Sequence, residues 1–326
     1  MRTILAGDIG GTKALLAIFE ERNGSFQPIE EACFASADYK GLSGILNEFL
    51  DQTGANIASA CLGVPGPVIG GTCRTTHHGW LIDIKEIKSQ LAIGEIFLIN
   101  DMAALAHAVP FLSKSQFEIL QIGQPEETSN IALIAAGTGL GQAFLLKPDE
   151  NELIVLSSEG GHCDFAPRTE LEIELLRFLL KKYKRVSVER VLSGYGLFHI
   201  YQFINSYHSF KEPDWLTKEF GEKDPAAVIT GNIAKSPACE KALNLFISIY
   251  GAVSGSLALQ MLAGVYLGGG IAPKIISKLK EGDFMEAFLA KGRFQDLLSR
   301  IPVHVIMDDK AALLGAARYA HSRTSG

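Results

Sequence analysis

The chain of 326 residues has few features of a secreted protein, a nucleic-acid-binding protein or a protein with a structural metal site. Its five cysteines are odd in number and form no CxxC pair, which favours a reduced, cytoplasmic protein and gives no ligand spacing for zinc. The net charge is −6 and no basic run occurs, which argues against nucleic acid and anionic membranes as partners. Any phosphate must therefore be held by backbone amides, a metal ion and a few local cations.

Long uninterrupted apolar runs are also missing. The first apolar run begins at Ile4 and reaches Asp8 within a few residues, so we expect no signal peptide. The longest apolar stretch, 250–270, contains serines, a glutamine and several glycines, and is typical of a buried helix followed by a strand rather than a membrane span. With 47% apolar and 20% charged residues, the composition predicts a packed core, and the length predicts two domains.

The most informative feature that is present is a pair of glycine turns, each between apolar runs. The first comprises Gly7, Asp8, Ile9, Gly10, Gly11 and Thr12, and the second is centred on Gly137, Thr138 and Gly139. Successive backbone amides in such turns form a concave anion site. A strand-like run follows each turn, whereas a dinucleotide fingerprint must open a helix, and no loop ends in the Gly-Lys-Ser/Thr of a Walker A motif. The pair indicates a duplicated unit that grips a polyphosphate from both sides; two plain β-turns are the alternative.

Two further features fit a metal-bound nucleotide. The carboxylate of Asp8 stands beside the first turn, where it could ligate Mg²⁺ or hold metal-bound water. A third cluster, Gly268, Gly269 and Gly270, ends an apolar run and could carry a flat nucleoside across its backbone, although a plain strand-to-helix turn explains it equally well.

The order of apolar runs predicts two α/β domains with mixed sheets. We expect a small domain over 1–110, joined by the C-terminal helix 309–326, and a large domain over 111–308, with the ligand in the cleft between them. The predicted strands are roughly 3–9, 14–20, 29–36, 58–65, 95–100, 131–136, 142–147, 152–158, 264–268 and 302–307. The predicted helices are roughly 41–53, 83–91, 102–111, 169–183, 193–206, 239–262, 273–280 and 309–321.

Polar side chains gather at three places after predicted strands. Asn100 and Asp101 stand between a strand and a helix, where Asp101 is a candidate either for a helix cap or for a base that accepts a hydroxyl proton. Glu159 and His162 are separated by two glycines that let both turn toward one point. From the local sequence alone, Glu189 and Arg190 look like an ordinary exposed pair of opposite charges. Carboxylates and amides in such numbers suit a sugar, whose hydroxyls both donate and accept.

Seven motifs occur in order along the chain: GDIGGT (7–12), IND (99–101), AAGTGLG (135–141), EGGHCDFAP (159–167), SVERVLSG (187–194), LGGGIAP (267–273) and KGRF (291–294). Together they resemble the bacterial glucokinase family, in the hexokinase branch of the actin-like ATPases. The resemblance implies two actin-like (ribonuclease H-like) domains, ATP-dependent phosphorylation of glucose at its 6-hydroxyl as the first step of glycolysis, and often a homodimer. It implies Asp101 as base, and Asn100, Asp101, Glu159, His162 and Glu189 as sugar ligands. It also implies that the first two glycine turns bind phosphates.

The chain departs from the family pattern at several positions. Lys13 stands where close members usually carry Asn, GVPGPV (63–68) looks more like the related kinase–repressor family, and His77 occupies a position typical of Asn. The cysteine-rich zinc motif of that related family is absent, so we expect no zinc.

Three other functions share some of these features. A kinase for another hexose or an N-acetylhexosamine would use the same motifs. A sugar-responsive repressor of the same fold carries a helix-turn-helix domain ahead of the first phosphate turn, and only six residues precede Gly7 here. An actin-like polymerising ATPase would not need the Glu159, His162 and Glu189 set. We therefore expect a glucokinase that acts on glucose and ATP.

Overall fold

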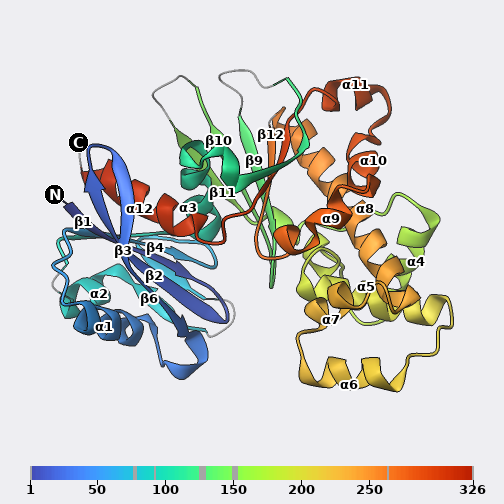
Figure 1. Ribbon diagram of the computed structural model, residues 1–326, viewed down its shortest axis with the longest axis horizontal. Helices are drawn as coiled ribbons and strands as arrows, with labels where there is room; N and C mark the ends of the chain where they lie inside the picture. The colour runs from blue at the N-terminus through green and yellow to red at the C-terminus, as the bar shows by residue number, and fades with distance from the viewer. Residues whose placement is uncertain are drawn as a thin grey trace. The chain divides into compact units, whose positions relative to one another are not determined.

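The computed structural model describes residues 2–75, 79–91, 93–124, 130–148, 153–262 and 264–324. The chain divides into two compact units (Figure 1). Unit 1 comprises residues 1–116, 155–157 and 308–326, and unit 2 comprises 117–154 and 158–307. The N-terminal segment and the C-terminal helix thus belong to the same unit.

Unit 1 is built on a five-stranded mixed sheet in the order β3-β2-β1-β4-β7. β1 pairs antiparallel with β2 and parallel with β4, and β4 pairs parallel with β7. The strands are β1 (Arg2–Ile9), β2 (Lys13–Arg22), β3 (Ser25–Ala35), β4 (Ser59–Val64) and β7 (Glu95–Asn100); a small separate sheet joins β5 (Thr72–Arg74) and β6 (Leu81–Asp83). The first glycine turn therefore connects two antiparallel strands, as the sequence predicted.

Helices cover both faces of this sheet (Figure 1). Because side chains alternate along β1, Leu5 packs in a cluster with α1, whereas Ile4 and Ala6 pack with α3 and α12. The helices are α1 (Leu42–Thr53), α2 (Ile84–Gln90), α3 (Asp101–Ala108) and α12 (Ala311–Thr324), with short 3-10 turns at 36–38, 109–111 and 114–116.

The edge strand β3 has an irregular and mostly exposed outer side. Its pairing with β2 shifts register between Ile18 and Phe19, next to the position where Pro28 faces Phe19. Glu30 and Glu31 follow on the same strand, and Glu31 is bonded to Lys310. The strand nevertheless completes the sheet over its whole length.

A second sheet has six strands in the order β11-β10-β9-β12-β13-β8. Five of these strands belong to unit 2, whereas residues 155–157 of β11 are counted with unit 1. The strands are β8 (Phe117–Gln121), β9 (Ile131–Ala136), β10 (Leu140–Leu146), β11 (Ile154–Ser158), β12 (Gly264–Gly268) and β13 (Val303–Ile306). β9 pairs antiparallel with β10 and parallel with β12, so the second glycine turn also joins antiparallel strands.

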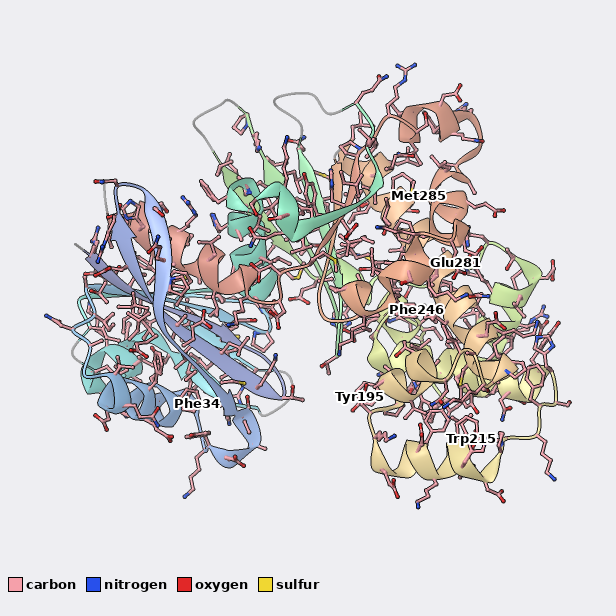
Figure 2. The ribbon with its side chains drawn as sticks, in the orientation of Figure 1. Phe34, Tyr195, Trp215, Phe246, Glu281 and Met285 are labelled. Atoms are coloured by element: carbon pink, nitrogen blue, oxygen red, sulfur yellow. The ribbon has the colours of Figure 1, made fainter. Side chains whose placement is uncertain are left out.

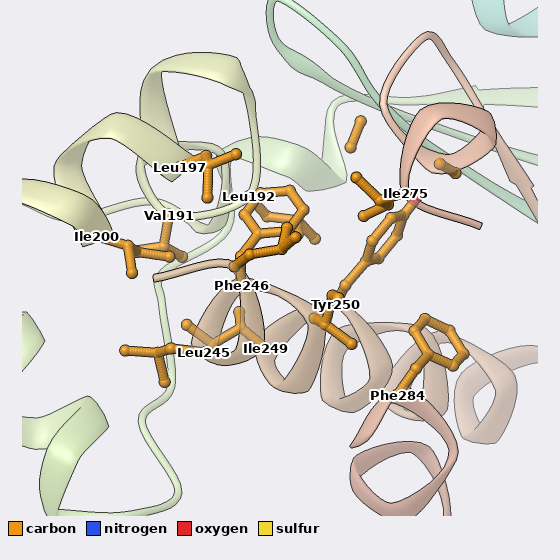
Figure 3. Close-up of a cluster of buried hydrophobic side chains, with 14 of the residues drawn as sticks. Val191, Leu192, Leu197, Ile200, Leu245, Phe246, Ile249, Tyr250, Ile275 and Phe284 are labelled. Atoms are coloured by element: carbon orange, nitrogen blue, oxygen red, sulfur yellow. The ribbon is translucent and has the colours of Figure 1, made fainter. Parts of the chain in front are cut away.

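The main core of unit 2 surrounds the long helix α8 (Pro237–Met261) and also includes buried residues of the sheet. Figure 3 shows the side chains of α8 gathered with those of residues 191–200 and with Ile275 and Phe284. Tyr250 is fully buried on α8, and its hydroxyl donates to the carbonyl of Ile134 on β9 (3.2 Å). α8 is long and apolar enough to cross a membrane, but 72% of its most apolar window is buried inside the protein. Its apolar side chains are therefore accounted for by the core.

The remaining helices of unit 2 pack around α8 and α5. They are α4 (Glu170–Leu180), α5 (Gly194–Tyr207), α6 (Asp214–Glu222), α7 (Pro225–Gly231), α9 (Ile276–Leu279), α10 (Asp283–Leu289) and α11 (Gln295–Leu298), with 3-10 turns at 160–162, 188–190, 272–275 and 292–294. The sequence did not predict β8, α6, α7, α10 or α11.

Candidate active site

The first glycine turn exposes only its tip. Gly10 donates its amide to the carbonyl of Lys13 (2.8 Å), which closes the turn, and Gly11 and Thr12 reach solvent. Gly7 and Ile9 lie in the core of unit 1 instead, because both belong to β1. A Cβ on Gly7 would stand 2.7 Å from a methyl of Leu62, so strand packing explains that glycine. The part of this turn that an anion can reach is therefore its tip, Gly11 and Thr12.

Asp8 lies at the end of β1, beside this turn. Burial raises the pKa of its carboxyl from 3.8 to about 6, and the nearby charge of Lys13 partly opposes the shift. Within the described residues its carboxylate accepts no hydrogen bond. Mg²⁺ is typically held by one or two carboxylates together with substrate phosphates, so a partly buried carboxylate of this kind fits a metal that arrives with a nucleotide. No group of three or more His, Cys, Asp or Glu residues able to hold a metal is found in the described ranges.

Asn100 and Asp101 lie where β7 meets α3. Asn100 caps the helix, because its Oδ1 accepts from the amides of Met102 (3.0 Å) and Ala103 (3.3 Å). Asp101 is the first helical residue, and its Oδ1 accepts from the same Met102 amide at 2.8 Å. The interpretation of Asp101 as the cap is therefore wrong: the cap is the residue before it.

The GVPG segment lies directly behind these two residues. Asn100 donates its side-chain amide to the carbonyl of Gly66 (3.3 Å), and Gly66 has a left-handed φ of 127°. A Cβ on Gly63 would lie 3.1 Å from the Cβ of Ala104 and 3.5 Å from the Cα of Asp101. The glycines of this motif thus let one backbone approach another and hold the start of α3.

The second glycine turn is fixed at both ends and open in the middle. Gly137 donates its amide to the carbonyl of Gly139 (2.9 Å), and its own carbonyl accepts from the amide of Gly194 (2.8 Å). A Cβ on Gly137 would meet nothing within 4 Å, and Thr138 is exposed. The turn is rigid yet accessible, as an anion site requires.

Glu189 joins this turn to a cluster of polar side chains. Its Oε2 accepts from the amide of Leu140 (3.0 Å), directly after the turn. A Cβ on Gly139 would lie only 2.6 Å from the same oxygen, so the glycine makes room for the carboxylate. Arg190 points elsewhere, with its guanidinium 4.3 Å from the centre of the Tyr183 ring. The interpretation of Glu189 and Arg190 as an ordinary exposed pair is therefore wrong.

His162 lies between two carboxylates. Its Nε2 is 3.9 Å from Glu159 Oε2, and its Nδ1 is 4.0 Å from Glu189 Oε1. The intervening glycines allow this because they press against β10: a Cβ on Gly161 would lie 2.2 Å from the carbonyl oxygen of Leu140. The convergence of Glu159 and His162 is thus confirmed. All three side chains keep accessible surface, so the cluster can offer several donors and acceptors to a polyhydroxyl ligand.

The third glycine cluster lies against the end of β9. Gly269 has a φ of 78°, and a Cβ there would lie 2.5 Å from the carbonyl oxygen of Ala136. The same oxygen accepts from the amide of Ile271 (3.2 Å). Gly270 faces open space. The second and third turns are therefore neighbours in unit 2.

Two contributors to this site were missed from the sequence. The amide of Leu140 positions Glu189, and the amide of Gly194 anchors the second turn. The Ser-Gly pair at the start of α5 is the feature of the sequence that could have indicated the role of Gly194. His77, which departs from the family pattern, lies outside the described residues.

Comparison with known proteins decides the family. The sequence model named Glucokinase matches residues 5–323. The chain belongs to the glucokinase family. A glucokinase of Nostoc punctiforme is 41% identical, with 97% of this chain and 98% of the relative covered, and one of Salmonella typhi is 36% identical, with 98% and 96% covered. The crystal structure of a glucokinase from an Antarctic psychrotroph superimposes with a TM-score of 0.83 at 34% identity, covering 99% of both chains.

More distant structures share the fold. A glucokinase of the ROK family from Streptomyces griseus, determined with glucose and AMPPNP, has a TM-score of 0.69 at 17% identity, covering 98% of this chain and 99% of the other. The two mixed sheets described above are thus those of the actin-like sugar kinases.

Proposed function

We propose that this chain transfers the γ-phosphoryl group of ATP to the 6-hydroxyl of glucose, giving glucose 6-phosphate and ADP. Family membership over residues 5–323 supports the reaction class, and relatives at 36–42% identity carry the name glucokinase. The observation that carries the proposal is the hydrogen bond from the Leu140 amide to Glu189. This bond supports the proposal because it joins Glu189, which we assign to the sugar, to the turn that we assign to the phosphates.

In unit 2, Glu159, His162 and Glu189 bind the sugar. Carboxylate oxygens accept from hydroxyls, and the imidazole both donates and accepts, so one edge of a pyranose can satisfy all three. We assign the 1- and 2-hydroxyls to this edge. A sugar that lacks the 2-hydroxyl leaves a carboxylate without its donor, and this loss is the source of specificity.

In unit 1, Asn100 and Asp101 bind the 3- and 4-hydroxyls, and Asp101 accepts the proton of the 6-hydroxyl. Its position in the first turn of α3 favours the ionised carboxylate, because the N-terminal end of a helix carries partial positive charge. Phosphoryl transfer proceeds through a loose transition state, so the hydroxyl loses its proton late and the base need not be strong.

The phosphates are held by the backbone of the two glycine turns, Gly11–Thr12 and Gly137–Gly139. The backbone of Gly268–Gly270 carries the nucleoside. The carboxylate of Asp8 would hold Mg²⁺ through a water molecule. When bound with ATP, Mg²⁺ neutralises charge on the β- and γ-phosphate oxygens. In this proposal each unit supplies one phosphate turn and part of the sugar ligands.

A coupled assay tests this function. Purified protein is given ATP, Mg²⁺ and one sugar at a time, and ADP release is recorded for glucose, 2-deoxyglucose, galactose, mannose and N-acetylglucosamine. We expect glucose to be the best substrate, with 2-deoxyglucose and galactose at least about tenfold lower in kcat/KM. A second coupling enzyme specific for glucose 6-phosphate verifies the position of transfer.

Other outcomes would favour the alternatives. Faster turnover of mannose or N-acetylglucosamine would indicate a kinase for another hexose. Sugar binding with no turnover would indicate a regulator of the same fold. We extend the proposal to a cytoplasmic enzyme that forms a homodimer. Sedimentation of the purified protein tests the dimer, and fractionation of the cells that make it tests the location.

A further inference from the structure

Tyr195 is a large exposed aromatic side chain in the first turn of α5 (Figure 2). It is 64% exposed, whereas Tyr201 and Phe203 on the same helix are 2% and 3% exposed. Single exposed aromatic residues are common and need no explanation by themselves. Tyr195 differs from them because it directly follows Gly194, whose amide is bonded to the second glycine turn.

The start of α5 is bonded to the second glycine turn. The amide of Gly194 donates to the carbonyl of Gly137 (2.8 Å), and Tyr195 is the next residue. Ser193 fixes this arrangement, because its Oγ accepts from the amide of Gly196 (3.0 Å) and donates to the carbonyl of Glu189 (2.8 Å). Since consecutive Cα atoms are about 3.8 Å apart, the Cα of Tyr195 lies one residue beyond the amide that is bonded to the turn.

The glycine turns themselves offer no apolar side chain. The second turn is Gly-Thr-Gly and the third is Gly-Gly-Gly, and both meet at the carbonyl of Ala136. The backbone of Gly268–Gly270, to which we assign the nucleoside, offers one side of a base no side-chain packing, and an aromatic ring is well matched to the other flat face of a base. Tyr195 is an exposed aromatic residue on the segment that is bonded to the second turn.

We propose that Tyr195 packs its ring against the nucleoside of the phosphoryl donor while the turn Gly137–Gly139 holds the phosphates. This inference rests on the proposed kinase function. Stacking does not read the hydrogen-bonding edge of a base. Tyr195 therefore distinguishes a nucleotide from a bare polyphosphate rather than one purine from another.

The test compares Tyr195→Ala with Tyr195→Phe. We expect Tyr195→Ala to raise the KM for ATP by roughly tenfold, and Tyr195→Phe to stay within about twofold of the parent, because the phenylalanine keeps the stacking face. The KM for glucose should not change. Inhibition by ADP should weaken in Tyr195→Ala as much as ATP binding does, whereas inhibition by inorganic triphosphate, which has no base, should be unchanged.

Tyr207→Ala is the matched control. Tyr207 ends the same helix, about 18 Å away at 1.5 Å per residue, and is 53% exposed. Its removal should leave both KM values unchanged. An unchanged KM for ATP in Tyr195→Ala, or an equal loss of ADP and triphosphate inhibition, would overturn the inference. If the parent protein turned over no sugar, the proposed function would fail instead, and calorimetric ADP binding to the same variants would still decide the role of Tyr195.

Discussion

Gly139 and Gly137 belong to one turn, yet alanine should affect different substrates at the two positions. Neither residue has a left-handed backbone, so the space around each Cβ decides the outcome. At Gly139 the new methyl would lie 2.6 Å from Glu189 Oε2 and would push the carboxylate off the Leu140 amide. At Gly137 it would meet no protein atom within 4 Å and would project into the space we assign to phosphate.

The magnitude follows from the hydrogen bond at risk. A hydrogen bond to a charged group contributes about 1.5–3 kcal/mol, and 1.4 kcal/mol corresponds to a factor of ten. If the displaced Glu189 no longer meets the sugar, Gly139→Ala should raise the KM for glucose by roughly 10- to 100-fold. Gly137→Ala should raise the KM for ATP and leave the KM for glucose unchanged.

Steady-state kinetics with each substrate varied at saturating levels of the other separates the two effects. The parent protein and both variants are compared at one pH, with circular dichroism to verify folding. The reasoning would be refuted if Gly139→Ala altered only the KM for ATP, because Glu189 would then not depend on the space that the glycine leaves.

Three further changes probe the base, the buried carboxylate and the helix packing. Asp101→Asn should lower turnover by about 10²–10⁴-fold with the fold intact by circular dichroism, and activity within about tenfold of the parent would rule out the base. The pKa of Asp8 is raised to about 6, so ionisation of this carboxyl destabilises the folded protein as the pH rises from about 4 to 6. Asp8→Asn should therefore increase the free energy of unfolding, measured with denaturant, by up to about 3 kcal/mol at pH 8 and leave it unchanged at pH 3, while activity is lost. An equal change in stability at both pH values would contradict this reasoning. Gly315→Ala would bring a Cβ within 1.7 Å of the carbonyl oxygen of Ala104 and should lower the free energy of unfolding by about 3 kcal/mol, as measured by thermal melting. Gly221→Ala is the control: its Cβ would meet nothing within 4 Å, so the same measurement should show no change or a small gain in stability.

The strands and the glycine turns could be predicted because their signals are local. β7 and β9 are continuous apolar runs bounded by polar or glycine residues, and their bounds agree with the prediction. α6 and α7 were missed, since each is short and carries few buried residues. β8 was missed because it is an edge strand with only partial burial, so its apolar pattern is weak.

In the candidate site, too, only the contacts between residues close in sequence could be predicted. Glu159 and His162 converge through a three-residue turn, so their spacing was enough to predict the convergence. Glu189 is bonded to the amide of Leu140, 49 residues away, and only the tertiary fold brings the two together. Asn100 and Asp101 are both capable of capping α3, and the backbone of the strand end decides in favour of Asn100.

The outer side of β3 has a consequence for how the protein behaves in a crowded cell. A strand from another molecule can extend a sheet only where a row of backbone donors and acceptors is straight and available. Here Pro28 has no amide hydrogen to donate, the pairing with β2 shifts register beside it, and Glu30 adds a charge to the exposed strand. These features disfavour the growth of unit 1 into a larger sheet, and we expect replacement of Pro28 and Glu30 by Val or Thr to make the same strand more prone to aggregation.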